Sequence, residues 1–187
     1  MKKRLAMNLG VTSQARKRVL GLFFLVAVCG AAGPGESAEA QEAKPWSVGD
    51  TIEGFELEDQ FGKVGRVDES TGLILFSRDM EGGELLSTAL QDKKSRFLSD
   101  RQVVYVSDIN GMPGLVARLF ALPKMRDRGY PMLLDRKGEV TARLPDEEGA
   151  GTLIELDELQ IVRIDFLSNA EEITAHLEAR SPQPVRH

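Results

Sequence analysis

Unbroken apolar runs alternate with amphipathic stretches along the middle of this chain, and each pattern predicts a different element. Residues 73–76 (Leu-Ile-Leu-Phe) and 103–106 (Val-Val-Tyr-Val) are apolar throughout, which is typical of strands that are buried on both faces of a sheet. Residues 84–98, which lie between them, repeat apolar positions at helical spacing. The inner face of that predicted helix is formed by Leu85, Leu86, Ala89, Leu90 and Phe97.

A second helix and a third strand are predicted to follow. Pro113 fits the first turn of a helix, and we expect this helix to end at Pro123. Its apolar face is formed by Leu115, Val116, Leu119 and Phe120. Residues 132–134 (Met-Leu-Leu) then predict a short strand before a turn at residues 135–138. Alternation of helices with apolar strands indicates a parallel core.

Two hairpins and a last helix are predicted around this core. Residues 55–58 alternate apolar and charged side chains before a turn, and residues 64–67 are expected to return as the partner strand. Residues 152–166 form a second predicted hairpin. The last helix is expected to open at Ser168, which can form a capping box with Glu171.

The N-terminus has the three parts of a secretory signal peptide. Residues 1–18 carry six basic and no acidic residues, and residues 19–32 are uncharged and mostly apolar. Ala38-Glu39-Ala40 offers the small residues that a signal peptidase reads. We expect cleavage between Ala40 and Gln41, a periplasmic or secreted location, and no membrane span after cleavage. Two alternatives stay open, a lipoprotein processed at Cys29 and an uncleaved membrane anchor.

The composition of the exported chain limits the bonds, metal sites and partners that it can have. Cys29 is the only cysteine, so cleavage would leave 147 residues without a thiol, which excludes disulfides and thiolate metal sites. The net charge would change from −5 to −9, because six basic and two acidic residues are removed. An acidic chain without basic clusters argues against binding to nucleic acid or to an anionic membrane surface. No nucleotide-binding motif occurs, so we expect no cofactor.

Several short stretches are distinctive across the mature chain: Val48-Gly49-Asp50, Phe55-Glu56-Leu57, Gln60-Phe61-Gly62-Lys63, Tyr130-Pro131-Met132-Leu133-Leu134-Asp135 and Gly138-Glu139-Val140, and then Leu144 with Asp146-Glu147-Glu148 and Thr152-Leu153-Ile154-Glu155-Leu156-Asp157. Together they resemble the thioredoxin-like superfamily. The chain looks most similar to the peroxiredoxin-like branch and to the small periplasmic YtfJ-type proteins. The resemblance implies an α/β thioredoxin-like fold over residues 48–179, with a central mixed sheet, helices on both faces and an N-terminal β-hairpin. Residues 41–47 are then a polar lead-in, and residues 180–187 a frayed tail.

The chain departs from this superfamily at the reactive residue. In such folds a cysteine follows the first core strand, but residues 77–83 contain none. Ser77 cannot replace it, because a hydroxyl without a neighbouring base is a poor nucleophile and cannot cycle through sulfenic acid. We therefore expect neither peroxidase nor thiol–disulfide oxidoreductase activity. The proline that normally faces the reactive residue is matched by Gly151 or by Pro131, depending on how the strands are counted, and we favour Gly151.

Polar loops are predicted at the carboxyl ends of the strands, where ligands bind in open α/β sheets. The candidate binding residues are Ser77, Arg78, Asp79, Asp108, Asn110 and Glu147. An arginine held between aspartates can bind a carboxylate or a phosphate through two parallel hydrogen bonds. The alternative is that these residues form salt bridges and helix caps at the strand ends. Their spacing matches no calcium loop, so we expect no metal site.

These observations predict a redox-inactive, exported thioredoxin-like protein that acts as a binding module in the cell envelope. Its expected partner is another envelope protein or a small anionic ligand. The alternative is a thiol-independent enzyme that uses the strand-end carboxylates of Asp79, Asp108 and Glu147. A deep pocket ringed by these residues would favour the enzyme, and a shallow apolar face rimmed by them would favour the binding module.

Overall fold

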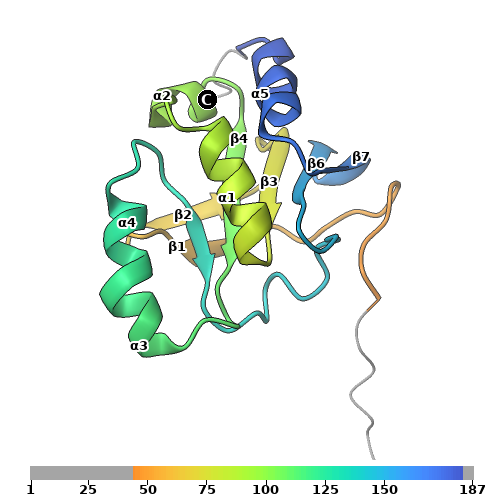
Figure 1. The fold of residues 1–187 in the computed structure, drawn as a ribbon. Helices are drawn as coiled ribbons and strands as arrows, with labels where there is room; N and C mark the ends of the chain where they lie inside the picture. The colour runs from red at the N-terminus through yellow and green to blue at the C-terminus, as the bar shows by residue number, and fades with distance from the viewer. Residues whose placement is uncertain (1–43, 183–187) are drawn as a thin grey trace, which may run out of the picture. The chain divides into compact units, whose positions relative to one another are not determined.

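The computed structural model describes residues 44–182 of the chain (Figure 1). The predicted signal peptide, its cleavage site between Ala40 and Gln41, the alternative processing site at Cys29 and residues 183–187 lie outside the described residues. Within the described range, every helix is too short or too polar to span a bilayer.

The centre of the fold is a mixed sheet of five strands. They are β3 (Leu73–Ser77), β4 (Val103–Asp108), β5 (Leu133–Asp135), β6 (Gly151–Asp157) and β7 (Gln160–Leu167). Their order is β5-β4-β3-β6-β7. β3 pairs in parallel with β4, and β4 with β5, as the apolar runs predict. β6 runs antiparallel to β3 and forms the predicted hairpin with β7.

A separate antiparallel hairpin precedes the sheet in sequence. β1 (Phe55–Glu58) pairs with β2 (Val64–Val67), which confirms the prediction from alternating residues. Asp59, at the turn, forms an isolated bridge with Leu133 at the start of β5. Gly65 lets the hairpin approach the sheet closely, because a side chain there would lie 2.5 Å from Cδ2 of Leu133.

The first predicted helix is in fact two helices, α1 (Met80–Ala89) and α2 (Ser95–Ser99). α1 begins earlier than predicted, because the side chain of Asp79 caps it by accepting a 2.7 Å hydrogen bond from an N–H in the first turn. α2 begins separately, because the N–H of Ser95 donates to the carbonyl of Gly129 at 2.8 Å. The spacing of apolar residues along the chain does not indicate this tertiary contact.

The prediction that the second helix ends at Pro123 is wrong. α3 (Gly114–Val116), the π-helical turn η1 (Ala117–Ala121) and α4 (Leu122–Arg126) follow one another, and Pro123 lies in the first turn of α4. Proline has no N–H to donate within a regular helix, and the wider π turn before it lets the helix resume. The apolar face predicted for this helix is exposed at Leu115, Val116, Leu119 and Phe120.

The last helix, α5 (Ala170–Ala179), is capped by Asn169 and not by Ser168. The side-chain oxygen of Asn169 accepts hydrogen bonds from the N–H groups of Glu171 at 2.8 Å and Glu172 at 3.4 Å. The predicted helix start is therefore wrong by one residue. Serine and asparagine are both good N-cap residues, so the sequence pattern does not separate them.

Two apolar cores flank the sheet. The first joins buried side chains of α1, α2 and α5 to sheet residues such as Leu75, Tyr105 and Leu153, and α1 lies over the sheet in Figure 1. The second contains Phe76 and Leu144, and it is covered by the hairpin and by the loop between β5 and β6. The predicted fold class is confirmed in its mixed sheet, helices and N-terminal hairpin. The buried helical side chains all belong to the first core.

Both ends of the described range contact this domain. The N–H of Trp46 donates to the carbonyl of Arg143 at 2.9 Å, and the guanidinium of Arg143 lies 4.7 Å from the centre of the Trp46 ring. Arg180, which the sequence assigns to the tail, places its Nη1 3.9 Å from Oε1 of Glu155. Its Nε also donates to the carbonyl of Arg101 at 3.4 Å.

Candidate functional site

The parallel pairing of β3 and β4 places two of the predicted residues side by side. Ser77 and Ser107 are partners in the register of the two strands, so Arg78 and Asp108, which follow them, lie at the same edge. Nη1 of Arg78 donates a 3.0 Å hydrogen bond to Oδ2 of Asp108. The side chain of Asp108 is only 7% exposed, so the aspartate of this pair is shielded from solvent.

Arg78 uses the rest of its guanidinium on the loop between β5 and β6. Its Nε donates to Oδ1 of Asp146 at 2.8 Å, and its Nη2 donates to the carbonyl oxygens of Thr141 and Leu144 at 2.9 and 3.0 Å. The guanidinium carbon also lies 5.2 Å from the centre of the Phe76 ring. Arg78 is thus a clamp that fixes this loop to the end of β3.

The same loop is organised from within by Asp135, which the sequence pattern indicates only as part of a turn. Its buried carboxylate accepts hydrogen bonds of 2.8–3.1 Å from the backbone N–H groups of Lys137, Gly138, Val140 and Thr141. Burial alone would raise the pKa of Asp135, but these hydrogen bonds favour the charged form, and the net effect lowers its pKa. The signal that could have found it is an aspartate at the first position of a turn.

The other predicted residues have local contacts. Asp79 caps α1, and its Oδ2 also accepts a 2.8 Å hydrogen bond from the N–H of Gly149. Asn110 donates its backbone N–H to Oδ1 of Asp108 at 2.9 Å. Glu147 is exposed, and the acidic residue of this loop that pairs with Arg78 is Asp146, the residue before it. Across the described part of the chain, no group of three possible metal ligands is close enough to hold an ion.

Ser77 is buried in a small network of hydroxyl groups. Its Oγ donates to Oγ of Ser107 at 3.1 Å and lies 3.4 Å from the hydroxyl of Tyr105, which donates to the carbonyl of Gly83 at 3.5 Å. Burial raises the pKa of Tyr105 to about 12, and the hydrogen bond with Ser77 offsets only part of this shift. Three neutral hydroxyls contain no base that could activate Ser77 as a nucleophile.

Within residues 77–83, where the resemblance implies a reactive residue, one position is closed by backbone packing. Gly82 is buried, and a side chain added to it would collide with the carbonyl group of Ala150. Gly151 follows Ala150 and begins β6, which pairs with β3. Pro131 precedes β5, and β4 lies between β5 and β3. The strand order therefore favours Gly151 over Pro131 as the match for the superfamily's proline.

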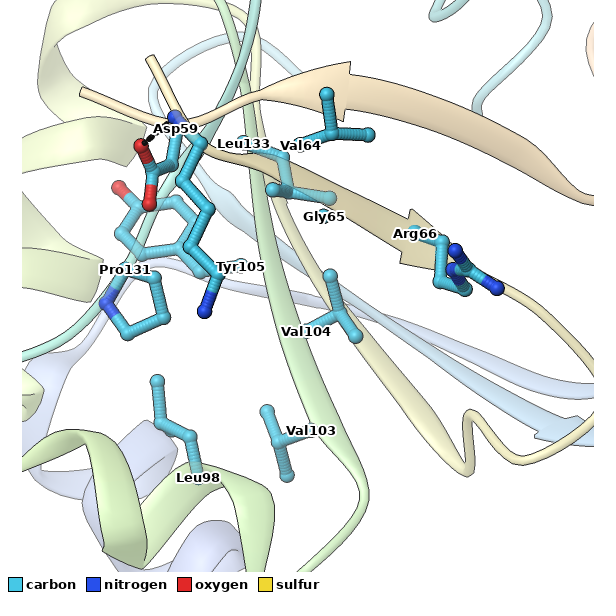
Figure 2. A pocket seen from close by; sticks show the side chains of 11 residues that line it. Asp59, Val64, Gly65, Arg66, Leu98, Val103, Val104, Tyr105, Pro131 and Leu133 are labelled. Carbon is cyan, nitrogen blue, oxygen red and sulfur yellow. Dashed lines mark hydrogen bonds between the residues drawn. The ribbon is translucent and has the colours of Figure 1, made fainter. Parts of the chain in front are cut away.

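Two surface cavities lie elsewhere on the domain. The first has a volume of about 220 Å³ and lies between β2, β4 and α2, with Leu98, Val103 and Pro131 in its lining (Figure 2). The second has a volume of about 360 Å³ and is lined by polar residues of α1 and of residues 124–130. Neither cavity is lined by any of the six predicted binding residues.

Known proteins share the fold of this chain at low sequence identity. No family model and no curated protein matches it. A putative protein disulfide isomerase from Bacteroides thetaiotaomicron has a TM-score of 0.51 and 14% identity, over 71% of this chain and 87% of that chain. Peroxidoxin BcpB from Mycobacterium tuberculosis has a TM-score of 0.47 and 21% identity, over 71% of this chain and 96% of that chain. The likeness to the disulfide isomerase structure concerns the fold alone, and that fold is thioredoxin-like.

Proposed function

We propose that this protein is a redox-inactive, exported thioredoxin-like protein that acts as a binding module in the cell envelope. The observation that carries the proposal is that residues 77–83, where the resemblance implies a reactive thiol, contain no cysteine. Within this stretch, Gly82 also packs so closely against the carbonyl of Ala150 that a side chain does not fit there. A domain that keeps this fold without its thiol offers surfaces for binding but no group for redox exchange.

The contacts at the strand ends support binding over thiol-independent catalysis. A catalytic carboxylate must be free to exchange a proton or to contact a substrate. The carboxylates of Asp79 and Asp108 instead accept hydrogen bonds from backbone groups and, for Asp108, from Arg78. Arg78 is itself occupied by the loop between β5 and β6. These contacts support an envelope protein over a small anionic ligand as the partner.

Export is part of the proposal and has a direct test. Protein purified from its native envelope should begin at Gln41 and carry no lipid. Intact-mass measurement decides this, because a chain that begins at Cys29 with a diacylglycerol adduct has a different mass. Such an adduct would make the protein a lipoprotein, and a retained N-terminus would make it membrane-anchored.

The absence of redox activity is tested by turnover, and the binding role by capture of a partner. The mature chain should match the buffer blank in assays with hydrogen peroxide and an external thiol, and in reduction of a protein disulfide. Cross-linking of the protein in its native envelope should yield a partner, and the purified pair should form a complex of defined stoichiometry. Turnover above the blank would overturn the proposal.

A further inference from the structure

β7 is the outermost strand on its side of the described sheet (Figure 1), and only its beginning has a neighbour on the outer edge. Ile161 donates its N–H to the carbonyl of Asp50 at 2.9 Å, and its carbonyl accepts a 2.8 Å hydrogen bond from the N–H of Gly49. The backbone groups at this end of the outer edge are therefore occupied.

The rest of the outer edge, residues 162–167, is open within residues 44–182. The chain that covers Ile161 does not continue along it, because residues 47–50 form a turn and the N–H of Trp46 then donates to the carbonyl of Arg143. No other described segment pairs with this part of β7 on its outer side. An open strand edge presents backbone N–H and C=O groups that can pair with another strand.

Apolar and charged side chains alternate along the open edge. Val162, Ile164 and Phe166 are apolar, and Arg163 and Asp165 lie between them. Val162 and Phe166 are 46% and 40% exposed, and the side chain of Arg163 is 58% exposed, so another strand can reach this edge. Nε of Arg163 lies 2.8 Å from Oδ2 of Asp165, which places both charges on the same face of the sheet.

These five residues are complementary to a second copy of themselves in one antiparallel register. When Ile164 of one copy lies opposite Ile164 of the other, Arg163 lies opposite Asp165, and Val162 lies opposite Phe166. Each cross-strand pair then joins two opposite charges or two apolar side chains, and such pairs stabilise antiparallel strands. A register centred on Arg163 or on Asp165 would instead place like charges directly opposite each other, which is destabilising. The two charges therefore select the register centred on Ile164.

We infer that this protein forms a symmetric dimer in which residues 162–166 of two copies pair antiparallel about Ile164. The pairing joins the two five-stranded sheets into one and uses the same surface of both copies. It ends at Ile161, whose backbone groups are already occupied. A strip of this length is small for an interface, so we expect a reversible equilibrium between monomer and dimer. The inference goes beyond the proposed binding role and does not depend on the absence of redox chemistry.

Sedimentation equilibrium over a concentration series tests the dimer with the chain of residues 41–187. The mass should rise from that of one chain to that of two as the concentration increases. Arg163→Glu places two like-charge pairs in the dimer, and we expect it to weaken association at least about tenfold. The matched control is Lys137→Glu, which makes the same change of charge at a side chain that is 77% exposed and lies outside β7. This control should leave association unchanged.

A second charge reversal tests whether the two charges face each other across the dimer. Asp165→Arg alone should also weaken association at least about tenfold, because it places arginines opposite each other. In a mixed pair of Arg163→Glu and Asp165→Arg, every charged position again lies opposite a charge of the other sign. The mixture should therefore form a dimer that neither variant forms alone. Melting temperatures, followed by circular dichroism, show whether each variant is folded.

Single cysteines test the register, because residues 41–187 contain no thiol of their own. Ile164→Cys places its two thiols opposite each other, and a short thiol-specific cross-linker should join the two chains. Val162→Cys is the matched control, because its two thiols would lie four residues apart along the paired strands, or about 13 Å. This control should cross-link at least about tenfold more slowly, although Val162 is the more exposed of the two positions.

Four results would overturn the inference. They are a chain that stays monomeric at millimolar concentration, an equal effect of Arg163→Glu and Lys137→Glu, a mixture that associates no better than its two folded components, and faster cross-linking of Val162→Cys than of Ile164→Cys. If the chain stayed monomeric and another envelope protein protected the amides of residues 162–167 from hydrogen exchange, the edge would belong to that partner. Redox turnover above the blank would remove the proposed function and leave the dimer unaffected.

Discussion

Arg78 joins separate segments of the chain through one guanidinium, and the free energy of unfolding should depend on it. Replacing it by alanine leaves the carboxylate of Asp108, which is 7% exposed, without its cation. Breaking a fully buried pair costs about 3–5 kcal/mol. Because the side chain of Arg78 is partly exposed, we expect Arg78→Ala to lower the free energy of unfolding by roughly 2–3 kcal/mol. Denaturant melts at neutral pH measure this loss.

Arg66→Ala is the matched control for that experiment. It breaks an ion pair whose side chains are 64% and 60% exposed, so the change should stay within about 1 kcal/mol. If the two variants unfolded at the same denaturant concentration, Arg78 would not be a structural clamp. Its predicted role in recognition would then gain support.

Asp135 should make the protein lose stability in acid. Its pKa is lower in the folded protein than the ordinary aspartate value of about 4. Such a group stabilises the fold fully above the unfolded pKa, and the contribution disappears as the pH falls through the folded pKa. Denaturant melts over a pH series should therefore show a steeper decline below about pH 4 in the wild type than in Asp135→Asn, which cannot titrate there. Parallel declines would contradict this assignment.

The sequence predicts which residues meet at the strand ends, but not how they bond. Arg78 and Asp108 are predictable neighbours, because they end adjacent parallel strands. The contact of Arg78 with Asp146 rather than Glu147 is not predictable, because a loop follows no periodicity. The path of that loop depends on the backbone N–H groups that donate hydrogen bonds to the carboxylate of Asp135. Binding by the candidate residues stays a prediction.

At the scale of elements, two adjacent glycines at the junction between α1 and β6 should respond differently to substitution by alanine. A side chain at Gly82 would collide with the carbonyl of Ala150, whereas one at Gly83 would lie 3.7 Å from Oγ of Ser77, an ordinary contact. Gly82→Ala should destabilise by about 2–3 kcal/mol through overpacking against backbone. Gly83→Ala should be neutral or stabilise by up to about 1 kcal/mol, because alanine favours the helix. Thermal and denaturant melts compare the pair, and equal effects would show that the junction is not tight.

The sequence predicts well those elements that depend on a local pattern of apolar and polar residues. The apolar runs at 73–76 and 103–106 became β3 and β4, and both hairpins were found. The errors fall where a tertiary contact decides the boundary, as at the start of α2, or where Pro123 follows a π turn. The spacing of apolar residues along the chain depends on neither the tertiary contact nor the π turn.

The whole molecule should be insensitive to reductants. A chain with one cysteine cannot form an internal disulfide, and the described domain is stabilised by two packed cores. The melting temperature, followed by circular dichroism, should therefore be the same with and without dithiothreitol. A shift would indicate a disulfide between two chains through Cys29, and hence that the N-terminus is retained.

The order of strands and helices along the chain was sufficient to predict the fold class, because few topologies accommodate it. The segments that cover the second face of the sheet could not be predicted from the order of elements. Leu144, which is fully buried there, belongs to a loop whose sequence has no strand or helix pattern. Its position follows from the contacts of Arg78 and Asp135 with the loop around it.

The tight junction at Gly82 also constrains what mutation and selection can do with this protein. Two of the four glycine codons become a cysteine codon by a single base change, so a thiol can arise in one step at a glycine that uses either of them. A cysteine at position 82 would meet the carbonyl of Ala150, and the variant would be lost through instability before any new activity could be selected. A cysteine at position 83 would meet no such obstacle. Of the two glycines in the first turn of α1, only Gly83 can therefore be replaced by a cysteine without a clash against backbone.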